Sequence, residues 1–97
     1  MRVRFTRRAT GDLADIAAYL NRHSPEAALH VRAAILSALQ RLAAFPLSGR
    51  AQSVEGVRKL VVRKYPYLVY YVIDAAAGEV IILTVQHAAR ERELRDR

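Results

Sequence analysis

The sequence predicts an α+β domain in which an N-terminal strand and an antiparallel helical hairpin precede a three-stranded antiparallel meander. Apolar residues recur at helical spacing over the first half of the chain, whereas they alternate or run continuously over the second half. The three later strands are joined by short loops, which favours antiparallel neighbours. We therefore expect the two helices to pack on one face of the sheet.

The first strand and the first helix lie within the first 22 residues. Residues 2–5, RVRF, alternate basic and apolar side chains and predict a short strand. Thr6 follows and offers a hydroxyl that can cap the next backbone amides. Apolar residues then repeat every three or four positions over 7–22, which predicts an amphipathic helix with Asp12 and Asp15 on its outer face.

The second helix is expected after a short break. Ser24 is a capping residue, Pro25 suits the first helical position, and the helix runs to about Ala44. Leu29 and Leu36 lie about 100° to one side of the main apolar stripe, which widens the apolar surface. Because the break is short, the two helices form an antiparallel hairpin. The main stripe consists of Ala28, Val31, Ile35, Leu39 and Leu42.

Three consecutive strands are expected in the second half. Residues 57–62 alternate, so that Leu60 and Val62 point inward. Residues 67–73 are apolar on both faces, which predicts a central strand. Residues 79–87 form the last strand. Strict alternation predicts its inward face to be Ile81, Leu83 and Val85.

Composition limits the classes of function. The 97 residues carry a formal net charge of +7, and 14 of the 16 basic residues are arginine, so an acidic partner is favoured. The chain has no cysteine, and no apolar run reaches the roughly 18 residues of a membrane helix. We therefore expect a soluble, cytoplasmic protein without disulfides.

A search for chemical motifs leaves one cluster. The three histidines have no acidic or cysteine partners at ligand spacing, and no phosphate-binding loop or nucleophile elbow is present. The sequence thus predicts no metal site and no cofactor. What remains is a set of cations and aromatic residues on and around the later strands. Its members are Arg58, Lys59, Arg63, Lys64, Tyr65, Tyr67, Tyr70, Tyr71, His87, Arg90 and Arg92.

This cluster has two interpretations. Cations beside aromatic rings can hold a phosphate and stack a base, with His87 as a general acid in RNA cleavage. Strand alternation, however, places the tyrosines on both faces of the sheet, so they form no continuous platform. In the second interpretation the tyrosines pack within the sheet, while Arg63 and Lys64 at the turn contact a partner.

Four stretches together resemble the ParE branch of the RelE/ParE superfamily of bacterial toxins. They are FTRRATGDLADIAAYL, FPLSGR, GVRKLVVRKYPYLVYYVI and VIILTVQHAARER. The resemblance implies a single toxin domain over residues 1–97, a small sheet packed on a helical hairpin. It also implies a hetero-oligomer with a cognate, ParD-like or other antitoxin, whose acidic C-terminal segment would dock at Leu29 and Leu36. Further partner contacts are expected from Lys59, Arg63, Lys64, Arg90 and Arg92.

The resemblance implies one of two activities, because the superfamily is divided. ParE-like members inhibit DNA gyrase, whereas RelE-like members are ribosome-dependent mRNA ribonucleases. Only two lysines are present, so the dense lysine set of a RelE-type site is missing, which favours a gyrase inhibitor without catalytic residues. In the alternative ribonuclease, His87 would be the acid. The charge on the reacting phosphate would be stabilised by Arg58, Arg63 or Arg90.

Overall fold

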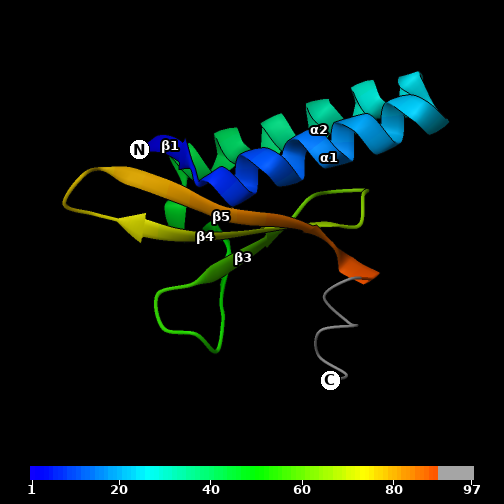
Figure 1. Ribbon diagram of the computed structural model, residues 1–97. Helices are drawn as coiled ribbons and strands as arrows, with labels where there is room; N and C mark the ends of the chain where they lie inside the picture. The colour runs from blue at the N-terminus through cyan, green and yellow to red at the C-terminus, as the bar shows by residue number, and fades with distance from the viewer. Residues whose placement is uncertain (90–97) are drawn as a thin grey trace.

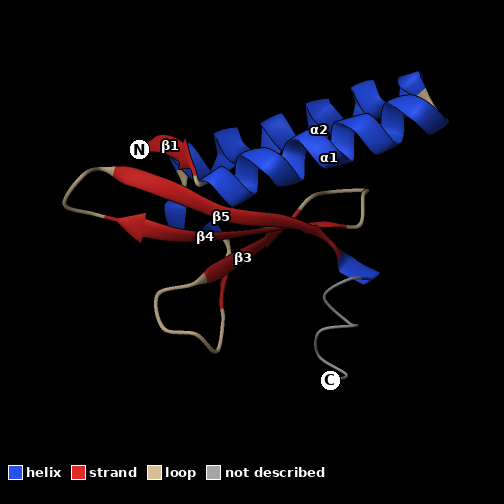
Figure 2. Cartoon of the chain, in the orientation of Figure 1, coloured by secondary structure: helices blue, strands red, loops and turns tan. Residues whose placement is uncertain are grey.

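Two helices lie on one face of a five-stranded sheet in the computed structural model, which describes residues 1–89 (Figure 1, Figure 2). The helices are α1 (Arg7–His23) and α2 (Pro25–Ala44), and a short 3₁₀ helix, η1 (Pro46–Ser48), follows them. The strands are β1 (Arg2–Phe5), β2 (Arg50–Ala51), β3 (Arg58–Val61), β4 (Tyr67–Asp74) and β5 (Glu79–His87).

The sheet has the order β1-β5-β4-β3-β2. β1 pairs with β5 in parallel, and the other neighbours are antiparallel. The predicted fold class is therefore confirmed, including the meander of β3, β4 and β5 and the placement of both helices on one face. The sequence analysis missed β2, which has only two residues.

The helix boundaries follow from their caps. The Thr6 hydroxyl accepts a hydrogen bond from the Ala9 amide at 3.0 Å, and the Ser24 hydroxyl accepts one from the Ala27 amide at 3.2 Å. Ser24 also donates its own amide to the carbonyl of Leu20 at 2.7 Å. This one residue therefore ends α1 and starts α2, which forces the chain to reverse and makes the helices antiparallel.

The expected alternation of inward and outward side chains is confirmed in β3. In β5 the side chains before residue 84 point to the opposite faces from those expected. Tyr70 pairs with Thr84 and Tyr71 pairs with Ile82, so Leu83 is an extra residue without a partner. This β-bulge reverses the side-chain alternation along β5. The buried residues are accordingly Val80 and Ile82 before the bulge and Val85 after it. Ile81 and Leu83, which were expected to point inward, are only half-buried.

The free edge of β5 is covered by α1. β1 ends at Phe5, and the Thr6 amide and hydroxyl then donate to the carbonyls of Ile82 and Leu83 at 3.0 and 2.7 Å. The Asp12 carboxylate accepts hydrogen bonds from the Val85 amide at 3.1 Å and from the Thr84 hydroxyl. The expectation that Asp12 faces outward is therefore wrong, because the neighbour of α1 on that side is a strand edge with a free amide.

A buried tyrosine joins the helical layer to the sheet. The Tyr71 side chain is fully buried, and its hydroxyl donates to the carbonyl of Pro46 at 2.7 Å. The same oxygen accepts a hydrogen bond from the Gly49 amide at 2.9 Å. A Cβ atom at Gly49 would lie 2.5 Å from this oxygen, so only glycine fits against the ring. The expectation that tyrosines pack within the sheet is confirmed for Tyr67 and Tyr71, which both belong to the core.

The bulge predicts unequal effects for two adjacent substitutions. Ile82→Ala removes a side chain with no exposed surface and is expected to lower the free energy of unfolding by about 2–5 kcal/mol. Leu83→Ala removes a half-buried side chain and is expected to cost roughly 1 kcal/mol. Urea unfolding of both variants measures the difference. A larger loss for Leu83→Ala would contradict the position of the bulge.

Candidate partner-binding surfaces

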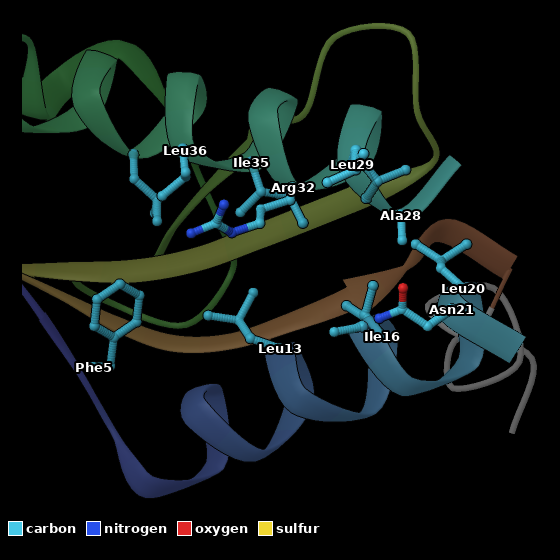
Figure 3. Close-up of a pocket in the computed structure, with 13 residues that line it drawn as sticks. Phe5, Leu13, Ile16, Leu20, Asn21, Ala28, Leu29, Arg32, Ile35 and Leu36 are labelled. Carbon is cyan, nitrogen blue, oxygen red and sulfur yellow. The ribbon is translucent and has the colours of Figure 1, made fainter. Parts of the chain in front are cut away.

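An apolar groove of about 300 Å³ runs between α1 and α2 (Figure 3). α1 contributes Leu13, Ile16 and Leu20, and Figure 3 shows the labelled side chains of both helices directed into the space between them. The most exposed large apolar side chains in the groove come from α2. Leu29 is 66% exposed and Leu36 is 46% exposed.

The position of these two leucines follows from how α2 packs. Its inner side, which includes Val31 and Ile35, is buried in the hydrophobic core. Leu29 and Leu36 lie beside that stripe and stay uncovered, with Arg32 between them on the same groove (Figure 3). Grouped exposed leucines are typical of interaction sites. The structure thus places both predicted docking residues on one groove.

The turn between β3 and β4 presents two cations. Arg63 and Lys64 are both exposed, as expected for partner contacts. Lys64 has a φ of 71°, a left-handed conformation that costs about 1–2 kcal/mol for a residue with a Cβ. Lys59 lies further along the sheet opposite Tyr70. Arg58 is half-buried, and its Nε atom is buried without a hydrogen-bond partner among residues 1–89.

A second cleft, of about 410 Å³, lies between α1 and the end of β5. One of its walls is His87, whose Nδ1 atom accepts a hydrogen bond from the Ala89 amide at 3.1 Å. The His87 ring meets the Tyr67 ring nearly edge-on, with centroids 5.5 Å apart and an angle of 84°. The cleft is lined by Arg8, Asp12, Asp15, Ile16, Tyr67, Val85, Gln86 and His87.

Among the described residues of the alternative ribonuclease, His87 alone lines this cleft. Neither Arg58 nor Arg63 lines it. Arg58 pairs with Tyr71 whereas His87 pairs with Tyr67, so four residues of β4, about 13 Å, separate the two rows. Arg90, the third cation of that set, lies outside the described residues, and so does Arg92, which was expected to contact a partner.

The sequence analysis missed the acidic side of the cleft. Arg8, Asp12 and Asp15 are spaced by four and three positions, so they share one face of α1. This spacing was visible, but the surface that the face meets depends on the bulge in β5. Within residues 1–89 no group of three or more histidine, cysteine or acidic side chains is arranged to hold a metal ion. No helix of the described chain is long and apolar enough to span a membrane.

Burial raises the pKa of Tyr67 above its ordinary value of 10.0, and the nearby Tyr19 hydroxyl raises it further. The unfolded chain therefore loses this proton first, so the free energy of unfolding is expected to fall as the pH rises from about 10 towards the higher pKa of the folded state. Urea unfolding of Tyr67→Phe should show a weaker fall over this range. Tyr65→Phe, outside the cleft, should retain the wild-type slope. Equal slopes for Tyr67→Phe and the wild type would contradict the assignment.

Comparison with known proteins gives consistent matches over most of the chain. A family model described as the ParE toxin of the type II toxin-antitoxin system, parDE, matches residues 3–92. Y4kP of Sinorhizobium fredii, which bears the name of a toxin, is 40% identical over 90 residues, or 93% of this chain and 91% of that protein. Toxin RelE2 of Caulobacter vibrioides is 39% identical over 87 residues, or 89% of this chain and 93% of that protein.

A solved structure has the same arrangement of helices and strands. The chromosomal ParDE TA system from P. aeruginosa contains a chain that superposes with a TM-score of 0.76 at 28% identity, covering 90% of this chain and 95% of that one. The family match, the two relatives and the shared fold agree with one another. The chain therefore belongs to the ParE toxin family of type II toxin–antitoxin systems.

Proposed function

We propose that this toxin acts by binding DNA gyrase and that it cleaves no covalent bond itself. The observation that carries the proposal is the separation of His87 from Arg58, one of the cations that RNA cleavage would need. A general acid and the cations that stabilise charge on a reacting phosphate must surround the same atoms. Here Arg58 and His87 lie about 13 Å apart along the sheet.

The bonding of His87 supports a structural role for this residue. Its Nδ1 atom accepts the Ala89 amide and so stabilises the backbone where the chain leaves β5. A proton on Nδ1 would remove this acceptor and break the hydrogen bond.

The charge in the cleft beside His87 is also wrong for RNA. Asp12 and Asp15 contribute two carboxylates, and among residues 1–89 Arg8 is the one arginine or lysine in the lining. Binding of a nucleic-acid backbone requires cations that neutralise phosphates. Two carboxylates beside the imidazole would repel a phosphate instead, so this cleft is a poor ribonuclease site.

The groove between α1 and α2 suits the antitoxin. An amphipathic helix can lay its apolar face in such a groove, with anchor residues spaced to meet Leu29 and Leu36. The net charge of +7 favours an acidic segment around those anchors. The similar P. aeruginosa chain belongs to a solved ParDE system, which supports a paired antitoxin for this chain too.

The gyrase proposal is tested with the purified full-length chain. We expect it to inhibit DNA supercoiling by gyrase or to trap cleaved DNA on the enzyme, and we expect His87→Ala to inhibit equally. The same preparations are incubated with translating ribosomes and mRNA, which we expect to stay intact. Cleavage of mRNA that disappears in His87→Ala, with gyrase unaffected, would establish the ribonuclease instead.

The antitoxin site is tested by placing a charge in the groove. Leu36→Glu is expected to weaken antitoxin binding by about 10–100-fold, because it removes roughly 1.5–3 kcal/mol of apolar burial. Val54→Glu is the matched control, since Val54 is 65% exposed in the loop between β2 and β3, away from the groove. Calorimetric titration of each variant with the antitoxin measures the change. Similar losses in both variants would place the docking site elsewhere.

A further inference from the structure

Among the described residues, the groove between α1 and α2 is lined by one charged side chain. The lining is apolar except for Asn21 and Arg32. Figure 3 shows the Arg32 side chain extending from α2 into the space between the helices, whereas Asn21 lies at one end of that space. The groove therefore offers an apolar contact, which any amphipathic helix satisfies, and a cationic contact, which only some helices satisfy.

The charge of Arg32 is not neutralised within the hairpin. Its guanidinium forms no ion pair or hydrogen bond with any of residues 1–89. The carboxylates of Asp12 and Asp15 on α1 line the separate cleft beside β5, and neither of them lines this groove. Because Arg32 is exposed, water hydrates its charge in the free protein.

A helix that docks in the groove must cover this arginine. Leu29 lies three residues before Arg32 and Leu36 lies four residues after it, so the two leucines are about 10 Å apart along α2 with the arginine between them. A helix that packs on both leucines removes water from the guanidinium. A cation that loses its water without gaining an anion is strongly unfavourable, whereas a carboxylate replaces the lost water with two charge-assisted hydrogen bonds.

We propose that Arg32 binds an acidic residue of the antitoxin's docking helix and thereby fixes the register of that helix in the groove. The inference rests on the proposed docking of the antitoxin in this groove, and it adds the residue that discriminates among amphipathic helices. Leu29 and Leu36 alone define the register weakly, because a shift by one turn can bring another apolar residue against each of them. A single polar pair within an apolar contact permits one register.

The spacing on α2 predicts the spacing on the docking helix. Two apolar anchors that meet Leu29 and Leu36 lie seven residues apart on a helix of the same pitch. The acidic residue that meets Arg32 lies between them. It follows the first anchor by three residues when the helix runs parallel to α2, and by four residues when the helix runs antiparallel to α2. The net charge of +7 attracts any acidic segment, but only an acid at this place pairs with Arg32.

The test uses the full-length chain and synthetic helical peptides of about 18 residues, or five turns. Every peptide carries two leucines seven residues apart. Two peptides carry glutamate three or four residues after the first leucine, and their matched peptides carry glutamine there. A further peptide carries the glutamate on its opposite face, which keeps the net charge. Fluorescence anisotropy at constant ionic strength measures each affinity. We expect one glutamate peptide to bind about tenfold more tightly than its glutamine match and the opposite-face peptide, the usual effect of a charge-assisted hydrogen bond.

Variants separate Arg32 from the general charge of the protein. Arg32→Gln should weaken binding of the favoured glutamate peptide by about tenfold and leave binding of its glutamine match nearly unchanged. Arg32→Glu should reverse the preference, so that a peptide with lysine at the same position binds more tightly than the glutamate peptide. Arg50→Gln removes an equal charge from an exposed residue of β2, outside the groove, and should leave the preference unchanged. Unfolding midpoints near the wild-type value establish that each variant is folded.

Three results would overturn the proposal. They are equal binding of the glutamate peptides and the opposite-face peptide, an equal effect of Arg32→Gln on glutamate and glutamine peptides, and absence of binding of every peptide up to about 1 mM. Leu36→Glu distinguishes this failure from failure of the groove itself. If Leu36→Glu abolishes peptide binding while glutamate and glutamine peptides bind the wild type equally, only the role of Arg32 is refuted. If Leu36→Glu leaves the binding of all peptides unchanged, the groove is not their site and both proposals fail.

Discussion

The architecture depends on how α1 closes the open edge of β5. β1 covers only the first four residues of this strand, and the remaining edge would expose backbone groups to water or to another chain. Thr6 and Asp12 supply the missing hydrogen bonds from the helix itself. Because these contacts hold the start of α1 beside the strand, the whole hairpin is directed across one face of the sheet (Figure 1).

This placement gives the hairpin two chemically different surfaces. Towards the end of β5, the polar face of α1 meets a strand and encloses the cleft with Tyr67 and His87. Between the helices, the apolar residues that the core does not use remain open as the groove. One pair of helices thus offers a carboxylate-lined cleft and a leucine-lined groove.

Local sequence signals were sufficient for most of the fold. Both helices were predicted because their caps, Thr6 and Ser24, are local and their apolar periods are long. The inward side of β5 was not predicted, because alternation assumes an uninterrupted strand and Leu83 interrupts it. β2 has only two residues, too few to show a period.

Of the two candidate partner-binding surfaces, the sequence predicted the leucines of the groove but not the surroundings of His87. The helical spacing of Leu29 and Leu36 predicted that they widen the apolar surface beside the main stripe, and both lie on the groove. Arg63 and Lys64 were expected at a turn, where they lie exposed. The surroundings of His87 required knowing which face of β5 meets α1, which only the register of β4 and β5 decides. Asp12 was misplaced because a helical pattern shows which residues avoid the core, but not that a strand edge can lie on the polar side.

The contact between Gly49 and Tyr71 has an evolutionary consequence. The phenol oxygen occupies the space where any larger residue at position 49 would place its first side-chain carbon. A larger residue at position 49 would clash with the Tyr71 ring. Loss of the Tyr71 hydroxyl would leave the amide of Gly49 and the carbonyl of Pro46 without their shared hydrogen-bond partner. Each position is therefore closed to change while the other stands, and descendants of this gene must exchange the two together or keep both.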